Sequence, residues 1–258
     1  MTPEEWKIVC DDITDRMRRH TRPFVTPLSY RKGTYRKLAG SGSYVACSGQ
    51  HLLLTCEHVA RINMLEQRFS GSSTDYCVRG PFTLKPDPDD VAWSVVPDIM
   101  WDGATDKAKA IPYKRFALKH EAVDQYEPLF FRGFAGENAH DDLVKYRTHG
   151  SGYCSQEKRE VKPESPIFEM LWNPEQTSIT SKTTRKARAA MKFNDPAGFS
   201  GSLVWNTRYR EITKSGRQWR PSHSVVTGIA RRYDPGTKTL LVLRVEHLRA
   251  ALEKGLSL

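Results

Sequence analysis

The sequence reads LLTCEHVA at residues 53–60, and this stretch tells more about the architecture than any other. It belongs to the apolar run Leu52–Cys56, and a second apolar run, Ser43–Cys47, lies just before it. The two runs are joined by Ser48-Gly49-Gln50, which is the pattern of a β-hairpin. We therefore expect two paired strands, the second of which ends close to His58.

Outward from this hairpin, short apolar runs alternate with turn residues. The further predicted strands are Val91–Val96, Pro128–Gly133, Ser202–Trp205, Val225–Arg232 and Thr239–Arg244. Many short strands predict an all-β barrel or sandwich. We expect loops or insertions over Arg61–Lys85 and His140–Pro166, which carry no such pattern.

Helices are expected only at the two ends of the chain. Residues 3–20 follow Thr2, which can cap a helix, and Pro3, which suits a first turn. Apolar residues recur there at helical spacing, at Trp6, Val9, Ile13 and Met17. A short amphipathic helix is predicted over Val245–Lys254.

Composition narrows the class of protein. The chain has 258 residues, of which 38% are hydrophobic, so it can form one large domain or two lobes. No apolar run approaches the roughly 18 residues that span a bilayer, and the N-terminus has no apolar core of a secretory signal. Five scattered cysteines without a CxxC pair indicate reduced thiols and do not form a zinc-knuckle pattern. No ligand spacing of a metal site is evident, and we expect no cofactor. We expect a cytoplasmic protein with no membrane contact.

The net charge of +10 raises a second possibility, a basic nucleic-acid-binding β-barrel. The basic residues gather in four clusters, and such clusters are also typical of solvated loops. No RNA-recognition, zinc-finger or P-loop motif accompanies them. We therefore do not expect nucleic acid as a partner and keep this reading as an alternative.

Two further segments carry polar residues of chemical interest. The sequence reads DDVAWSV at residues 89–95, where Asp90 directly precedes an apolar strand. It reads DPAGFSGS at residues 195–202, where Ser200 stands between glycine-rich turns. Together with His58, these segments place a histidine, an aspartate and a serine in that chain order.

The three segments, with the run GSGSYV at 40–45, resemble the trypsin-like serine proteases of the chymotrypsin fold. The resemblance extends in order from Tyr35 to Leu252. It implies two six-stranded antiparallel β-barrel lobes, with a lobe boundary near residues 112–125. Residues 1–34 would then form an N-terminal helix and lead-in, and residues 35–258 the protease domain.

The same resemblance implies a role for each polar residue. Ser200 would be the nucleophile and His58 the base that takes its proton, while Asp90 would fix the imidazole tautomer. Asp89 is the alternative acid. The backbone amides of Gly198 and Ser200 would form the oxyanion hole. Secreted members have an acid before the nucleophile that binds a newly cut N-terminus; Phe199 stands there in this chain, so we expect activity without N-terminal processing.

Substrate specificity is less clearly encoded. The base of the family's pocket falls on Asn194, with Asp195 beside it, and an aspartate there would favour Arg or Lys. Arg231 and Arg232 lie where the pocket wall is expected. If either faced inward it would favour an acidic side chain, and if both faced solvent neither would contribute.

The sequence thus predicts a serine endopeptidase that acts on a protein or peptide and that is restrained by a regulatory protein partner or by its own added segments. An inactive protease fold that serves as a binding module is the main alternative. An esterase would use the same residues, because oxyanion chemistry does not distinguish an ester from an amide.

Overall fold

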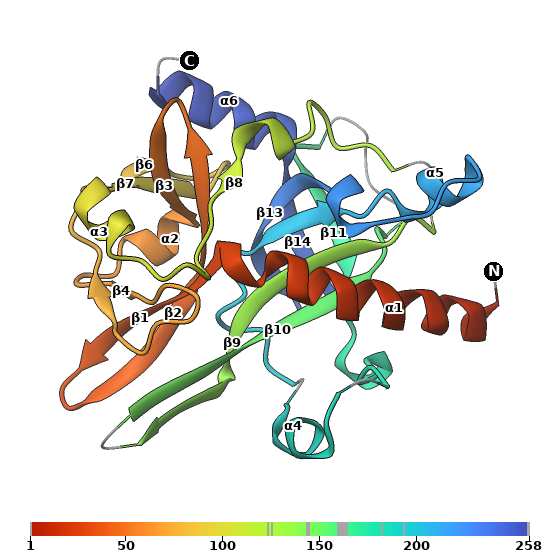
Figure 1. The fold of residues 1–258 in the computed structure, drawn as a ribbon, viewed down its shortest axis with the longest axis horizontal. Helices are drawn as coiled ribbons and strands as arrows, with labels where there is room; N and C mark the ends of the chain where they lie inside the picture. The colour runs from red at the N-terminus through yellow and green to blue at the C-terminus, as the bar shows by residue number, and fades with distance from the viewer. Residues whose placement is uncertain are drawn as a thin grey trace.

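A computed structural model describes residues 2–256, except 123, 125, 143–144, 159–164, 182 and 193. Two β-sheets follow one another along the chain, and Figure 1 shows them as two neighbouring lobes. The first sheet has the strand order β5-β4-β1-β2-β3-β7-β6, with β8 paired in parallel to β2. Its strands are β1 (Val25–Lys32), β2 (Tyr35–Cys47), β3 (Gln50–Thr55), β4 (Glu66–Gln67), β5 (Tyr76–Cys77), β6 (Thr83–Lys85), β7 (Val91–Val96) and β8 (Ile111–Pro112).

The second sheet has the order β10-β9-β12-β13-β14-β11, and all its pairs are antiparallel. Its strands are β9 (Leu129–Asp142), β10 (Lys145–Ser155), β11 (Ile167–Leu171), β12 (Leu203–Asn206), β13 (Val225–Asp234) and β14 (Thr239–Arg244). The chain passes from the first sheet to the second between β8 and β9, through the 3₁₀ turn η2 (Tyr113–Arg115).

The predicted two-lobed β architecture is confirmed, with three differences in detail. The first sheet has eight strands instead of six. It includes β1, which the sequence analysis placed in the lead-in, and three short strands in the expected loop 61–85. Residues 140–142 and 145–155 of the expected loop 140–166 are the end of β9 and the whole of β10, which pair antiparallel, with the Lys145 backbone opposite that of Asp142. A two-stranded ribbon is held by backbone hydrogen bonds, so it needs no apolar pattern that a sequence would reveal.

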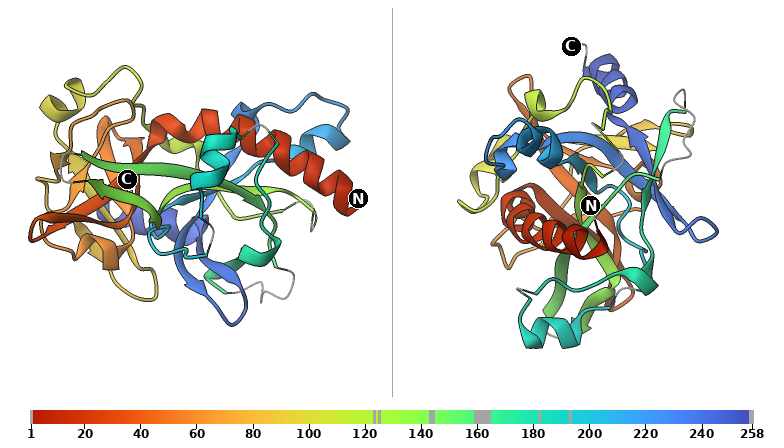
Figure 2. Two further views of the ribbon diagram at one scale, coloured as in Figure 1. Left: turned by 90° about the horizontal axis from the view of Figure 1, so that it is seen from below. Right: turned by 90° about the vertical axis from the view of Figure 1, so that its right-hand side faces the viewer.

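The N-terminal helix α1 (Pro3–Thr21) begins with the predicted cap. The Glu5 amide donates to the Thr2 hydroxyl at 3.2 Å, and the Thr2 amide donates to the Glu5 carboxylate at 2.8 Å. Ile13 and Met17 on its apolar side are fully buried. Figure 2 shows α1 lying along the outside of β9 and β10. Among the described residues, no helix is long and apolar enough to cross a membrane.

The remaining helices are short, apart from the C-terminal one. They are α2 (Glu57–Ala60), α3 (Asp98–Asp102), α4 (Arg185–Ala190), α5 (Tyr209–Lys214) and α6 (Val245–Leu256), with the 3₁₀ turns η1 (Arg22–Phe24), η3 (Pro174–Gln176) and η4 (Pro221–His223). The predicted C-terminal helix is therefore confirmed, and its apolar residues Leu248 and Leu252 are fully buried.

Candidate active site

The pairing of β3 with β7 brings His58 and Asp90 to the same edge of the first sheet. Thr55, the last residue of β3, is opposite Ala92 near the start of β7. His58 follows β3 by three residues, on the short helix α2, and Asp90 precedes β7 directly. Antiparallel pairing therefore places two residues that are 32 positions apart next to each other.

The His58 ring contacts the Asp90 carboxylate through Nδ1. The distance from Nδ1 is 2.9 Å to Oδ2 and 3.0 Å to Oδ1, and the His58 backbone amide donates to Oδ1 at 3.1 Å. An ionised carboxylate accepts only, so Nδ1 carries the proton and Nε2 is left as an acceptor. Asp90 has a φ of 51°, a left-handed conformation that aspartate tolerates better than most residues.

Asp90 is a buried acid that the site keeps ionised. Its burial by itself raises its pKa. The hydrogen bonds from the His58 ring and amide outweigh this, and with the positive charge of Arg231 they bring the pKa of Asp90 below its ordinary value. The Arg231 Nε lies 3.5 Å from Asp90 Oδ2, and the same guanidinium forms an ion pair with Asp87.

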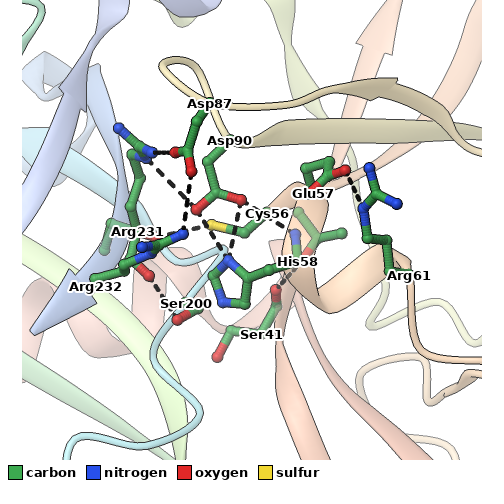
Figure 3. Close-up of polar contacts among 12 residues, drawn as sticks. Ser41, Cys56, Glu57, His58, Arg61, Asp87, Asp90, Ser200, Arg231 and Arg232 are labelled. Atoms are coloured by element: carbon green, nitrogen blue, oxygen red, sulfur yellow. Dashed lines mark hydrogen bonds and ion pairs between the residues drawn. The ribbon is translucent and has the colours of Figure 1, made fainter.

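Ser200 comes from the second lobe, from the turn before β12. Figure 3 shows the His58 ring with Nδ1 toward Asp90 and its opposite edge toward Ser200. The Ser200 hydroxyl donates to the backbone carbonyl of Arg231 at 2.6 Å. The Ser41 amide donates to the Ser200 carbonyl at 2.9 Å, which fastens the turn to β2.

The turn at 196–199 has the conformation that its glycine allows. The Phe199 amide donates to the Pro196 carbonyl at 3.0 Å, and Gly198 has a φ of 105°. A β-carbon on Gly198 would lie 2.6 Å from the Phe134 carbonyl oxygen. Both the positive φ and this close approach therefore favour glycine at position 198. Among the described residues, neither the Gly198 amide nor the Ser200 amide donates to another backbone group. Both amides are therefore candidate donors for an oxyanion, as the resemblance implies.

Ser41 positions this turn, and the sequence analysis gave it no role. Its hydroxyl donates to the Gly198 carbonyl at 2.7 Å and accepts from the Phe134 amide at 2.9 Å. Its own carbonyl accepts from the Thr55 hydroxyl at 2.8 Å. Ser41 belongs to the glycine-rich run at 40–45, so the signal was present in the sequence, but the contact joins residues 157 positions apart.

Phe199 holds the turn in place through apolar packing of its side chain. Only 1% of Phe199 is exposed, and its ring lies edge-on to three others at 5.1–6.0 Å between centroids, those of Phe131, Tyr153 and Trp172. The residue before Ser200 is thus held by an aromatic cluster and not by an ion pair.

Comparison with solved structures places this arrangement in a known fold. The active form of the Rv3671c protease of M. tuberculosis matches with a TM-score of 0.57 at 12% identity, over 94% of this chain and 85% of that one. The serine protease domain of the Sesbania mosaic virus polyprotein matches at 0.51 and 11% identity, over 89% and 92%. Mouse neuropsin, a serine protease, matches at 0.52 and 12%, over 92% and 96%.

The chain has the chymotrypsin fold. No protein-family model matches the sequence, and no curated protein does. At identities of 10–13% the likeness concerns the arrangement of the backbone alone. The predicted site residues His58, Asp90 and Ser200 stand on the two lobes of this fold as described above.

The predicted pocket residues are placed in three different ways. Asn194 and Asp195 are exposed, and the Asp195 carboxylate accepts from the Ala197 amide at 2.8 Å within its own turn. Arg231 is 9% exposed, and its guanidinium faces Asp87 and Asp90 instead of solvent. Arg232 is exposed, with Nη2 3.5 Å from Asp87. The charge of Arg231 is therefore already matched by carboxylates of the protein, and the substrate pocket itself stays a prediction.

One group of side chains near the site has metal-ligating atoms. Ligand atoms of Cys56, His58 and Asp90 lie within 4.8 Å of one another. Burial and the nearby Asp90 charge raise the pKa of the Cys56 thiol well above its ordinary value, and the thiol donates to the Ala230 carbonyl at 3.3 Å. A metal binds the thiolate, and Arg231 beside Asp90 would repel a cation. These residues are better suited to hydrogen bonding than to holding a metal.

Proposed function

We propose that this protein is a serine endopeptidase in which Ser200 is the nucleophile, His58 the general base and Asp90 the residue that orients the imidazole. The observation that carries the proposal is the His58–Asp90 pair, with Nε2 left as an acceptor on the side of Ser200. A serine hydroxyl is a weak nucleophile at neutral pH and needs such a base. The two free amides of the Gly198–Ser200 turn support the proposal because they provide donors for an oxyanion.

The reaction would begin with a rotation of the Ser200 side chain. The Ser200 hydroxyl now donates a hydrogen bond to the Arg231 carbonyl. For the reaction, the hydroxyl must turn so that it donates to Nε2 of His58. Such a rotamer change takes place in picoseconds to nanoseconds at an exposed side chain and costs about one ordinary hydrogen bond, roughly 1 kcal/mol. Ser200 is partly exposed, so nothing buried has to move with it.

After that rotation, His58 would take the proton as the Ser200 oxygen attacks a peptide carbonyl. The negative charge that forms on the carbonyl oxygen would be held by the amides of Gly198 and Ser200, and Asp90 would stabilise the imidazolium. His58 would then return the proton to the leaving amine, which gives an acyl-enzyme. Water would release the acyl group by the same steps in reverse order.

We also propose that the turn is formed without N-terminal processing. The aromatic cluster around Phe199 supports this, because it stabilises the turn with groups that are present in the unprocessed chain. Protein that retains residues 1–34 should therefore react with a serine-directed probe. Reaction only after removal of N-terminal residues would contradict this part of the proposal.

The substrate and the class of bond are tested by identifying the cleavage products. Wild-type protein and Ser200→Ala are each incubated with a cell lysate, and new N-termini are compared by mass spectrometry. We expect new termini that appear with the wild type only, and their sequences would give the preferred residue before the cut. If both samples contain the same termini while the wild type hydrolyses a simple ester, the protein is an esterase. If the wild type produces no new termini of its own and hydrolyses no ester, the result favours the inactive binding module.

A further inference from the structure

A cavity outside the candidate active site is lined by several arginines. It has a volume of about 600 Å³ and lies between the end of α1, the start of β1, the residues after β4 and the strands β9 and β10. Its charged or titratable lining residues come from all of these elements except β1, and they are Arg18, Arg19, Arg22, Arg68, Arg132 and His149. A cavity of this size holds a small molecule.

Arg132 lines this cavity, and its charge has no carboxylate partner among the described residues. It is 9% exposed, and its Nε makes no hydrogen bond. Its only hydrogen bond among the described residues runs from Nη1 to the Arg18 carbonyl at 3.3 Å. Burial, with the charges of Arg18 and Arg22, lowers the pKa of Arg132 to about 10, so the guanidinium is still charged at neutral pH. A buried charge without a partner destabilises the fold unless something else compensates it.

The backbone makes room for the Arg132 guanidinium. Gly150 on β10 lies beside it, and a β-carbon there would come within 2.9 Å of Nη2 and 3.2 Å of Nε. A side chain at this position would require the guanidinium to shift. The absence of a side chain on Gly150 thus leaves room for the guanidinium where it stands.

The carboxylates around the cavity do not neutralise it. Asp15 pairs with Arg19 at 2.7 Å and lies 3.8 Å from Arg18. Asp75 pairs with Arg68 at 2.7 Å and is shared with Arg36. Among the side chains that the structure describes, neither Arg22 nor Arg132 has a carboxylate partner. The cavity therefore has an excess of positive charge that comes from separate elements.

We propose that this cavity binds a small soluble ligand that carries two or more phosphate groups. Planar guanidinium groups match phosphate oxygens by paired hydrogen bonds, and several of them around one cavity can bind several phosphates at once. A single phosphate would leave part of the positive charge unmatched. The cavity is partly open, and its volume of about 600 Å³ suits a compact ligand better than a nucleic-acid strand, which would need a long groove.

The proposal is tested by calorimetric titration of the full chain at 0.15 M NaCl. The probes are tripolyphosphate, pyrophosphate and orthophosphate. We expect affinity to fall in that order, with one tripolyphosphate bound per chain. Arg22→Gln should weaken tripolyphosphate binding about tenfold, which corresponds to the loss of one charge-assisted contact. Arg132→Met should weaken it at least as much.

The matched control is Arg217→Gln. Arg217 is an exposed arginine far from the cavity, so its loss changes the net charge equally and should change binding less than about twofold. Equal weakening by Arg22→Gln and Arg217→Gln would overturn the proposal, as would no binding of tripolyphosphate. Binding of a DNA oligonucleotide or of anionic vesicles without tripolyphosphate binding would also overturn it. If Arg132→Met does not fold, Arg22→Gln alone decides, because Arg22 is exposed.

Discussion

Two arginines of this protein are buried to the same extent but in opposite electrostatic surroundings. Arg231 and Arg132 are each 9% exposed. Arg231 lies between Asp87 and Asp90, next to the His58–Asp90 pair. Arg132 lies among other arginines and has no carboxylate partner among the described residues. The role of a buried charged side chain is therefore inferred from the groups that pair with it, and not from its burial alone.

The comparison separates a region whose charges are paired within the protein from a region in which some positive charges have no carboxylate partner among the described residues. Around Asp90, each charge is matched by the protein itself, which fixes the geometry of the site in advance. Around Arg132, the charges of Arg22 and of Arg132 itself have no carboxylate partner among the described residues, as expected where a ligand supplies the counter-charge. The two regions meet at β9: Phe134 lines the arginine cavity, while its amide donates to Ser41, which in turn donates to Gly198.

The largest expected effect comes from Asp90→Asn, which removes one charge from the matched region. An asparagine side chain has one acceptor oxygen, and its NH2 group cannot accept the Nδ1 proton of His58. The imidazole is therefore no longer held in one orientation and one tautomer. We expect reaction with a fluorophosphonate probe to slow on the order of 10⁴-fold. Asp89→Asn is the control, since Asp89 makes no side-chain contact with His58, and it should react like the wild type. The opposite result would assign the acid to Asp89.

Ser41→Ala tests the contact between the two regions. The change removes the donor to the Gly198 carbonyl, so the turn amides are held less firmly. We expect the probe reaction to slow about 10- to 100-fold. This effect is at most as large as the effect of removing an oxyanion donor itself. Ser43→Ala on the same strand is the control, because the buried Ser43 hydroxyl has no hydrogen-bond partner. Equal slowing by both changes would show that Ser41 has no special role.

The two arginines themselves should differ in their effect on stability. Arg231→Met leaves Asp90 buried without its nearby charge, and we expect the free energy of unfolding to fall by about 1–2 kcal/mol. Arg132→Met removes an unmatched charge, and the unliganded protein should lose nothing or gain up to about 1 kcal/mol. Urea denaturation with unchanged m-values measures both. A marked loss of stability in Arg132→Met would mean that Arg132 serves the fold.

Much of the site could be predicted from the sequence, because its residues sit inside short local patterns. His58 follows a hairpin, Asp90 precedes a strand and Ser200 lies in a glycine turn, and although each pattern is weak alone, their chain order together predicted one site. The hairpin between β2 and β3 and both terminal helices were predicted for the same reason.

The features that the sequence did not reveal depend on contacts between distant residues. Arg18 and Arg22 fall at the end of α1, while Arg68 and Arg132 belong to two other segments, and only the packing of these elements brings the four residues to one cavity. The partnership of Arg231 with Asp87 likewise joins residues 144 positions apart. No local pattern marks such pairs, so the two possible directions of Arg231 could not be distinguished in advance.

Acidification provides the smallest expected effect. The pKa of Asp90 lies below its ordinary value of 3.8, because the His58 hydrogen bonds and the Arg231 charge outweigh the effect of burial. The ionised carboxylate therefore stabilises the fold above about pH 4, and this contribution is lost as the pH falls through the lower, folded-state value. Below about pH 4 the wild type should lose stability relative to Asp90→Asn, and urea denaturation between about pH 5 and pH 3 measures the difference. A wild type that gains stability relative to Asp90→Asn over this range would contradict the lowered pKa of Asp90.

The most direct test of the site is the location of a covalent adduct. Unprocessed wild-type protein is treated with a fluorophosphonate and analysed by peptide mass spectrometry, beside Ser200→Ala and His58→Ala of confirmed fold. We predict a single adduct on Ser200 in the wild type, none on Ser200→Ala, and at most a trace on His58→Ala because the base is missing. A folded wild type without an adduct, or equal labelling of His58→Ala, would contradict activation of Ser200 by His58.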